Sequence, residues 1–228
     1  MTVHAIAVIP ARYASSRLPG KPLVELAGAP MVEHVWRRAC ASSVQGVVVA
    51  TDDERIARAV EVFGGTAVMT STEHRCGTTR VHEAVQDLDC EVVVNVQGDE
   101  PLVDPSVIDA LVAAFDDASV QIATLAAPGD DEGAVRVLVD EAGDAVDFRR
   151  GPISGSLQHL GLYAYRREAL EDFVSLGPTA REERERLEQL RLLDHGRRIR
   201  VVVVESASPS VDTLEDLARV RKILEEHI

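Results

Sequence analysis

The sequence has few of the features that mark a disulfide-rich, zinc-binding or membrane protein. Only three of its 228 residues are cysteine, and Cys40, Cys76 and Cys90 are too widely spaced for a disulfide framework or a zinc site. We therefore expect a reduced, cytoplasmic protein. The apolar run at residues 5–9 is too short for a signal peptide, and no stretch is long enough to span a membrane.

Basic residues are also scarce. There are 24 Lys and Arg against 38 Asp and Glu, which gives a formal net charge of -14 at pH 7. A chain this acidic is a poor candidate for broad binding to nucleic acid or to anionic membranes. An anionic ligand would need basic groups concentrated in one place. They are concentrated near the start, where Arg12, Arg17 and Lys21 all precede the first acid, Glu25.

Short β-branched runs alternate with helical patterns along the first half of the chain. The pattern predicts strands at residues 3–9, 46–51, 66–69 and 91–96, and helices at 30–41, 54–63 and 78–88. This alternation is typical of βαβ units in a largely parallel sheet that is covered on both faces. The loops after successive strands then share one edge, where such sheets bind ligands.

The second half of the chain has shorter connections. It predicts strands at residues 120–126, 134–139, 145–148 and 160–166, a charged helix at 179–195, a strand at 199–204 and a helix from 213. Turn-forming Gly and Asp residues separate the first of these strands. We interpret residues 120–166 as a small antiparallel insertion within a single domain of residues 1–228.

A basic loop at residues 9–22 follows the first predicted strand. Its cations and hydroxyls are Arg12, Ser15, Ser16, Arg17 and Lys21. The cations would neutralise a triphosphate and the hydroxyls would donate to its oxygens, while Gly20 permits close approach of the backbone. The spacing is not that of a Walker A loop. A solvated basic loop is the alternative interpretation.

Three further segments contain residues that could bind a metal ion or a nucleotide. Asp99 follows the strand at 91–96, where a carboxylate can bind Mg²⁺ together with phosphate oxygens. Asp212, in the segment 211–216, is a candidate second ligand, and capping of the last helix is the alternative. The segment 77–80 begins a predicted helix, whose amides suit a phosphate or a base edge, and plain capping is the alternative there too.

Taken together, these segments resemble the 3-deoxy-manno-octulosonate cytidylyltransferases, also called CMP-Kdo synthetases. The resemblance runs nearly end to end, through residues 9–22, 50–52, 77–80, 94–101, 159–166, 187–191 and 211–213. The opening loop and the segment 94–101, Val-Asn-Val-Gln-Gly-Asp-Glu-Pro, are its most specific parts. The resemblance implies an α/β, Rossmann-like nucleotidyltransferase fold, use of CTP and Mg²⁺, and usually a homodimer.

The resemblance also implies roles for individual residues. The triphosphate would be held by Arg12, Ser15, Arg17 and Lys21, and the cytidine would be surrounded by Thr51, Gly77, Thr78 and Arg80. Mg²⁺ would be bound by Asp99 and Asp212. The sugar-acid pocket would be lined by Arg150, His159, Tyr163, Glu185 and Gln189. Gln97 is assigned to both the nucleotide and the sugar. The implied reaction is attack of the sugar's anomeric hydroxyl on the α-phosphate of CTP, giving a CMP-sugar and pyrophosphate.

The sequence departs from the family pattern mainly in its sugar-facing half. The segment 151–158 is much shorter than usual, 127–135 is also shortened, Cys76 stands where Ser is usual, and Arg149 replaces a Ser. The acceptor is therefore open between Kdo and an analogue. Two other functions remain as alternatives: coupling of a different nucleotide to a sugar phosphate, and a non-catalytic nucleotide-binding regulator of the same fold.

Overall fold

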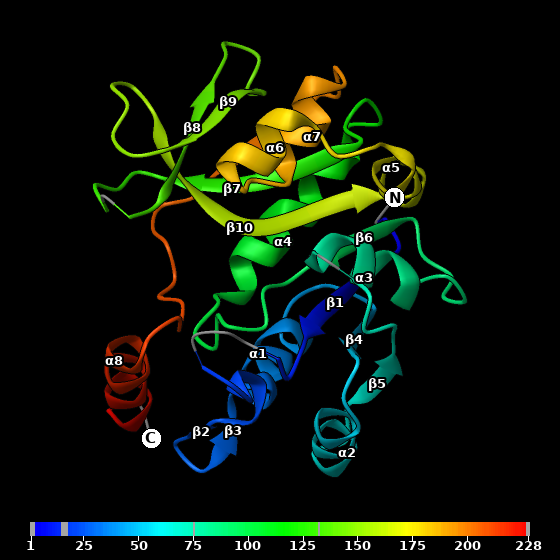
Figure 1. The fold of residues 1–228 in the computed structure, drawn as a ribbon, viewed down its shortest axis with the longest axis vertical. Helices are drawn as coiled ribbons and strands as arrows, with labels where there is room; N and C mark the ends of the chain where they lie inside the picture. The colour runs from blue at the N-terminus through cyan, green and yellow to red at the C-terminus, as the bar shows by residue number, and fades with distance from the viewer. Residues whose placement is uncertain (1–2, 15–17, 75, 132, 227–228) are drawn as a thin grey trace.

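A parallel sheet forms the first half of the chain (Figure 1). The computed structural model describes residues 3–14, 18–74, 76–131 and 133–226. The strands β1 (Ala5–Ala11), β4 (Gly46–Thr51), β5 (Thr66–Met69) and β6 (Val92–Asn95) are connected by α1 (Met31–Cys40), α2 (Glu54–Val62) and α3 (Gly77–Ala84). They lie in the order β6-β1-β4-β5, all parallel. The predicted mainly parallel α/β fold is thus confirmed.

The second half adds strands to the β6 side of this sheet. These are β7 (Ile122–Ala127), β8 (Val135–Val139), β9 (Ala145–Arg150), β10 (Leu157–Arg166) and β11 (Arg200–Val203). The long strand β10 lies between β6 and β7 and is antiparallel to both, while β11 is parallel to β7. The antiparallel hairpin β8–β9 continues from the first residues of β10. The predicted antiparallel segment is therefore built onto the main sheet.

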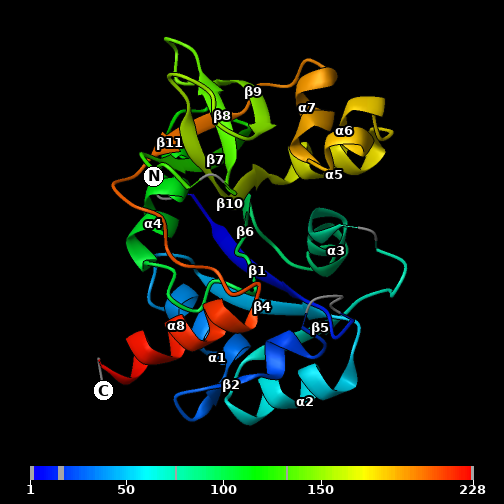
Figure 2. The ribbon, with the colours of Figure 1, turned by 60° about the vertical axis from the view of Figure 1, so that its left-hand side comes forward.

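Alternation of side chains along the strands gives the sheet two apolar faces. In β1, Ala7 and Ile9 face one way, whereas Ile6 and Val8 face the other. The first face is covered by α1, α2 and α4 (Pro105–Ala113), and the second by α3, α5 (Arg167–Ser175) and α7 (Gln189–Asp194). Figure 2 shows these two helical layers on opposite sides of the sheet. Both faces of the strands are buried, which explains their near-continuous runs of Val.

The predicted single helix at 179–195 is wrong. The structure has α6 (Ala180–Glu185) and then α7, because Arg186 takes a left-handed conformation with φ of 56°. The helix α4, with Asp104 as its N-cap and Pro105 in its first turn, was not predicted. Also unpredicted were α5 and the small hairpin of β2 (Glu25–Leu26) with β3 (Ala29–Pro30).

The last helix, α8 (Leu214–Glu225), packs against the beginning of the chain. Thr213 and Asp216 form a capping box at its start. Its Leu217 and Val220 join a buried cluster with Leu26 from β2 (Figure 2). This contact brings residues 211–213 close to the loop that follows β1. None of the helices among the described residues is long and apolar enough to cross a membrane.

Candidate active site

Lys21, Asp99 and Asp212 meet at the carboxyl edge of the parallel strands. The Lys21 Nζ donates to Asp99 Oδ2 at 2.6 Å, to Asp212 Oδ1 at 3.2 Å and to the carbonyl oxygen of Val211 at 2.9 Å. The backbone amide of Val211 in turn donates to the Asp99 carbonyl oxygen at 2.9 Å. Three predicted phosphate and metal residues, far apart in sequence, are therefore brought together.

The turn before Lys21 depends on Gly20. This residue has a φ of +70°, and its amide donates to the carbonyl oxygen of Tyr13 at 2.9 Å, which closes the loop. A Cβ at Gly20 would lie 3.1 Å from the Tyr13 ring, and the other side of that ring carries the Arg55 guanidinium, 3.4 Å from its centroid. Arg12 is exposed at the start of this loop. Of the predicted triphosphate residues, Ser15 and Arg17 lie outside the described residues, as does Ser16.

A second glycine sets the position of Asp99. An added Cβ at Gly98 would lie 2.8 Å from the backbone oxygen of Pro10, closer than real Cβ atoms come to other atoms. The loop after β6 can pass this close to the end of β1 only because residue 98 has no side chain. Asp99 follows directly, so the same close approach carries its carboxylate to Lys21.

A cavity of about 260 Å³ opens beside these three residues. Its lining includes Arg12, Lys21, Gly77, Arg80, Gln97, Asp99 and Asp212. The buried Arg80 donates to Asp52 Oδ2 at 2.7 Å and to Thr70 Oγ1 at 2.5 Å, which fixes its guanidinium. Thr78 follows the lining residue Gly77, and Thr51 pairs in the sheet with the lining residue Ala11, but both threonines are fully buried. We refer to this space as the nucleotide-side cavity.

His74 also lines the nucleotide-side cavity, and it was not among the residues selected from the sequence. Its Nδ1 lies 3.1 Å from Thr79 Oγ1, and its Nε2 pairs with Glu83. That hydrogen bond is the main cause that lowers the pKa of Glu83. A single histidine with no partner at helical spacing has no recognisable pattern, so only the fold shows that it belongs to the site.

A wider cavity of about 920 Å³ adjoins the first and shares Cys76, Gln97, Asp99 and Asp212 with it. We call it the sugar-side cavity, and of the predicted sugar residues Arg150, His159, Tyr163 and Gln189 line it. Gln97 links the two cavities, since its Nε2 donates to the Gly161 carbonyl oxygen at 2.7 Å. Gly161 lies where the pairing of β10 with β7 shifts register.

His159 is held in a defined orientation within the sugar-side cavity. Its Nε2 lies 3.0 Å from Thr124 Oγ1, and its ring packs against Phe148 and Tyr163, with centroids 5.0 Å and 5.4 Å away. Burial lowers the pKa of His159 to about 3. The imidazole is therefore neutral at physiological pH and can hydrogen-bond to a ligand without adding positive charge.

Glu185 does not reach the sugar-side cavity, and Glu188 does. The Glu185 carboxylate accepts from Arg184 Nε at 3.0 Å, whereas Glu188 is among the lining residues. Glu188 Oε1 accepts from Thr78 Oγ1 at 3.0 Å, and burial raises the pKa of Glu188. Glu185 was assigned to the sugar pocket through the resemblance to the family, and the chain breaks between α6 and α7 at Arg186, one residue after it.

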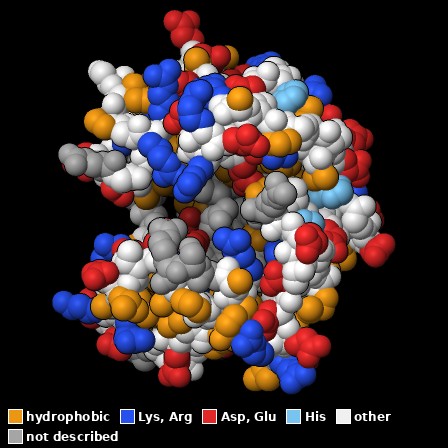
Figure 3. Space-filling view, viewed as in Figure 1, with side chains coloured by type: hydrophobic (Ala, Val, Ile, Leu, Met, Phe, Trp, Pro, Cys, Tyr) orange, Lys and Arg blue, Asp and Glu red, His pale blue; other side chains and the backbone are white. Residues whose placement is uncertain are grey.

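The short connection from β9 to β10 lies between two residues that line the same cavity, Arg150 and Gln158. Arg136 on β8 donates from Nε to Ser156 Oγ at 3.0 Å, from Nη2 to the Ser156 carbonyl oxygen at 2.7 Å and from Nη1 to the Gly129 carbonyl oxygen at 2.7 Å. One buried arginine thus fixes the ends of both segments that the sequence showed to be shortened. Figure 3 shows the resulting hollow, with basic side chains on its rim and acidic atoms at its base.

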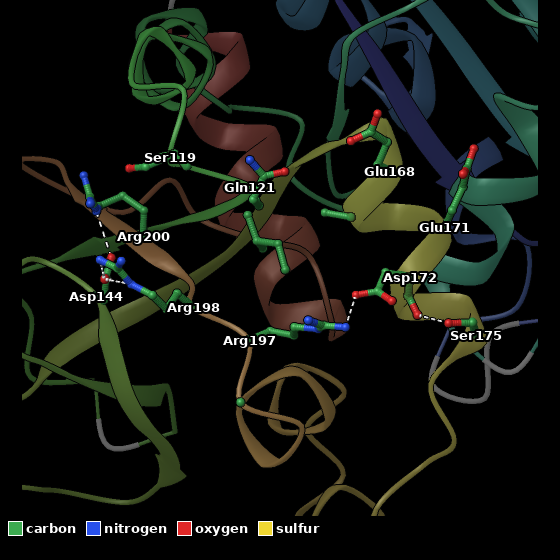
Figure 4. Close-up of a pocket in the computed structure, with 14 residues that line it drawn as sticks. Ser119, Gln121, Asp144, Glu168, Glu171, Asp172, Ser175, Arg197, Arg198 and Arg200 are labelled. Carbon is green, nitrogen blue, oxygen red and sulfur yellow. Dashed lines mark hydrogen bonds and ion pairs between the residues drawn. The ribbon is translucent and has the colours of Figure 1, made fainter.

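A further cavity of about 760 Å³ lies between α5 and the residues that lead into β11 (Figure 4). Its arginines are already matched by acids: Arg198 and Arg200 both bind Asp144, and Arg197 binds Asp172. Of the described residues that the sequence selected for the site, none lines it. This cavity therefore offers no prepared place for a triphosphate.

The carboxylates of Asp99 and Asp212 suit a magnesium ion that also binds phosphate. Mg²⁺ is usually held by one or two carboxylates together with substrate phosphates and water. No cluster of three or more His, Cys, Asp and Glu ligands occurs among the residues that the structure describes, so an all-protein cage is not indicated. The Lys21 ammonium lies between the two carboxylates, which shows that the site accepts a cation there. The residues present fit Mg²⁺.

Comparison with known proteins decides the family. Residues 6–199 match the family model for cytidylyltransferases. The 3-deoxy-manno-octulosonate cytidylyltransferase of Nitratidesulfovibrio vulgaris is 48% identical over 242 residues, covering 96% of each chain. The chain belongs to this family. The Escherichia coli member is 41% identical over 239 residues, covering 98% of this chain and 97% of its own.

Solved structures agree with this placement in the family. A CMP:2-keto-3-deoxy-manno-octonic acid synthetase complexed with CTP has a TM-score of 0.95 at 40% identity, covering 99% of this chain and all of its own. A 4-diphosphocytidyl-2C-methyl-D-erythritol synthase from Anaerococcus prevotii, with a TM-score of 0.70 at 15% identity, shares the fold alone. The predicted family and its enzyme class, nucleotidyltransferase, are confirmed.

Proposed function

We propose that this protein transfers the cytidylyl group of CTP to the anomeric hydroxyl of a 3-deoxy-2-ulosonic sugar acid, either Kdo or an analogue, with Mg²⁺ as cofactor. One observation carries the proposal: Lys21, Asp99 and Asp212 meet at the place that two adjoining cavities share. The nucleotide-side cavity has Arg12 and Lys21 for a triphosphate, and the sugar-side cavity has Arg150 for a carboxylate.

The reaction needs positioning and charge neutralisation more than a protein nucleophile. The anomeric oxygen of the sugar acid forms a bond to the α-phosphorus of CTP, and the bond from that phosphorus to the bridging oxygen of the β-phosphate breaks. Pyrophosphate leaves with the bond electrons, and the proton of the hydroxyl goes to solvent. Arg12 and Lys21 would hold the phosphates in line, with Ser15 and Arg17 of the same loop as further phosphate residues.

Asp99 and Asp212 are the residues that would hold Mg²⁺. The ion would supply neutralisation of phosphate charge and activation of the attacking hydroxyl. Around the cytidine we place Gly77 and Arg80, with Thr51 and Thr78 buried behind them. In the sugar-side cavity we place Gln97, His159, Tyr163 and Gln189 and add Glu188, and we keep Glu185 as a residue next to its rim.

We further propose that the enzyme works in the cytoplasm as a homodimer. The relatives that support the family assignment carry the activity in their names, and the match extends over nearly the whole of both chains. The acceptor stays open between Kdo and an analogue, because only residues 151–156 connect β9 and β10, and the flanking Arg150 and Gln158 line the sugar-side cavity.

The deciding experiment is incubation with each nucleoside triphosphate, Mg²⁺ and a panel of 3-deoxy-2-ulosonic acids, with pyrophosphate release measured and products identified by mass. We expect a CMP-sugar with CTP and a background rate with UTP, GTP and ATP. Turnover with UTP or GTP and a sugar phosphate would instead support the other nucleotidyltransferase function. Binding of CTP with no turnover on any acid in the panel would contradict the proposal.

A further inference from the structure

A side-chain hydrogen bond joins α3, beside the nucleotide-side cavity, to the start of α7, beside the sugar-side cavity. Thr78, in the first turn of α3, donates from Oγ1 to Glu188 Oε1 at 3.0 Å. Glu188 is the residue at which α7 begins, 110 positions further along the chain. Because α3 and α7 both cover the same face of the sheet, this bond crosses the boundary between the two halves of the site.

Thr78 is placed to act on Glu188 and not on a nucleotide. Its exposed fraction is 0%, whereas the preceding residue, Gly77, lines the nucleotide-side cavity. A fully buried hydroxyl that already donates to a carboxylate has no second proton to give to a ligand. The side chain of Thr78 therefore contacts a ligand only through the group that it binds.

Glu188 is the group through which Thr78 acts. Glu188 lines the sugar-side cavity, and its second oxygen, Oε2, is buried without a hydrogen-bond partner among the described residues. A buried acceptor without a donor is costly unless a ligand or water supplies one. Oε1 is the oxygen that Thr78 holds, so Oε2 is the one that still needs a donor, and the hydroxyl groups of a sugar are suitable donors.

The groups around the Thr78–Glu188 hydrogen bond are largely buried. Burial, and after it the Glu188 carboxylate, raise the pKa of the neighbouring Cys76 thiol to about 12, so the thiol stays protonated. The Cys76 thiol adds no charge beside Glu188 and also lines both cavities. Hydrogen bonds in such buried surroundings are stronger than hydrogen bonds exposed to water.

We infer that Thr78 is a positioning residue for the sugar acid: its hydroxyl holds one oxygen of Glu188 and so aims the other at the acceptor substrate. This inference rests on the proposed function. It assigns Thr78, a residue of the nucleotide-side helix, to recognition of the sugar. The specific consequence is that removal of the hydroxyl weakens binding of the sugar acid and spares binding of CTP.

The test is steady-state kinetics of Thr78→Val, Thr78→Ser and the wild type with CTP and the sugar acid that turns over best. Val keeps the shape of Thr and removes the hydroxyl, and Ser keeps the hydroxyl. We expect Thr78→Val to raise the KM for the sugar acid about tenfold while the KM for CTP changes less than about twofold. Thr78→Ser should restore the wild-type KM. Thr66→Val, at an exposed position on β5, is the matched control and should leave both KM values unchanged.

A double-mutant cycle separates action through Glu188 from a general packing effect. If Thr78 acts only through Glu188, Thr78→Val should change sugar-acid affinity less than about twofold when Glu188→Ala is already present. Sugar-acid binding in the presence of α,β-methylene CTP, followed by calorimetry, gives this measurement even where turnover is lost. CTP titration of each variant confirms that it is folded.

Three outcomes would overturn the inference. The first is a sugar-acid KM that does not change in Thr78→Val, and the second is a CTP KM that rises as much as the sugar-acid KM. The third is a loss of sugar-acid affinity in the Glu188→Ala background as large as the loss that Thr78→Val causes in the wild type. In all three the wild type still makes a CMP-sugar, so the proposed function stands. A wild type that binds CTP and converts no ulosonic acid refutes the proposed function and this inference with it.

Discussion

The ammonium group of Lys21 lies 2.6 Å from the carboxylate of Asp99, across 78 residues of sequence. Two glycines make this meeting possible. Gly20 turns the chain sharply just before Lys21, and Gly98 lets the loop after β6 pass against Pro10 just before Asp99. The charges that would handle a metal and a triphosphate are thus positioned by backbone geometry at the ends of two neighbouring strands.

Asp99→Asn should abolish Mg²⁺-dependent turnover while largely sparing the fold. The change removes the negative charge that would bind the metal and keeps the shape of the side chain. We expect kcat/KM to fall by at least about a thousandfold, because a metal supplies several kcal/mol of transition-state stabilisation. Stability should change by less than about 1 kcal/mol, since the ion pair with Lys21 is partly exposed.

The measurements are pyrophosphate release over a range of Mg²⁺ concentrations and urea unfolding. Asp87→Asn, in the exposed turn after α3, is the matched control and should keep wild-type activity. Full activity in Asp99→Asn would show that the metal assignment is wrong.

Lys21→Met should make the protein depend on Mg²⁺ for stability as well as for activity. Without the ammonium, the carboxylates of Asp99 and Asp212 lose a cation that binds both of them, and two like charges held at one site repel. We expect a lower Tm than the wild type in EDTA and a larger rise in Tm on adding Mg²⁺, because a ligand that binds only the folded state stabilises it. The KM for CTP should rise about tenfold or more.

Thermal unfolding in EDTA and in several Mg²⁺ concentrations measures this response. Lys222→Met, on the exposed side of α8, is the control and should behave as the wild type does. An equal response to Mg²⁺ in Lys21→Met and the wild type would mean that the two carboxylates do not share a metal.

The parallel half of the fold could be predicted because its signals are local. Runs such as residues 47–49 and 92–94 are too apolar for a strand with one exposed face, and helical patterns fill the intervals between them. Asp99 could be selected for the same reason, since it follows a buried strand directly and such sheets bind ligands at the carboxyl ends of their strands. The pairing of β10 between β6 and β7 could not be predicted, because strand order depends on contacts between distant segments.

One residue assigned to the sugar half of the site, Glu185, is not among the residues that line the sugar-side cavity, and it lies next to an unusual backbone angle. Nothing in the charged run around Arg186 shows that this residue is left-handed, a conformation that is uncommon for residues other than Gly. That single angle ends α6 and leaves Glu188, and not Glu185, at the sugar-side cavity. For Asp212 the sequence left two roles open, metal ligand or cap of the last helix. The packing of α8 on Leu26 and Val211 brings Asp212 to Lys21.

Gly98→Ala should destabilise the protein and reduce activity together. The new methyl group would lie 2.8 Å from the backbone oxygen of Pro10, and a backbone atom cannot move aside as a flexible side chain can. We expect a loss of about 1–3 kcal/mol in the free energy of unfolding, the usual range for overpacking, with a displaced Asp99 and lower kcat. Urea unfolding and initial rates measure the two effects.

Gly177→Ala is the matched control for that change. Nothing lies within 4 Å of a Cβ at Gly177, so this variant should be neutral in both assays. A Gly98→Ala protein with wild-type stability and rate would show that the loop has room that the structure does not indicate.

His159→Gln should make the folded protein less sensitive to acid. Burial lowers the pKa of His159 to about 3 in the folded state, below its ordinary value of about 6.5. The unfolded chain therefore takes up a proton below pH 6.5 that the folded protein excludes, so the wild type loses stability as the pH falls from about 6.5 towards 3. A single group of this kind contributes a loss of about 1.6 kcal/mol between pH 6.5 and 5.

Urea unfolding at pH 7.5, 6.5, 5.5 and 5 for the wild type and the variant tests the effect. Gln can still donate to Thr124 Oγ1, so the hydrogen bond in the sugar-side cavity is kept while the titrating group is removed. The difference in unfolding free energy between the two proteins should shift by about 2 kcal/mol in favour of His159→Gln as the pH falls from 7.5 to 5. His195→Gln, at an exposed position, should follow the wild type. Parallel curves for His159→Gln and the wild type would mean that His159 takes up protons equally in the folded and unfolded states, and then a neutral imidazole could not be assumed in the sugar-side cavity.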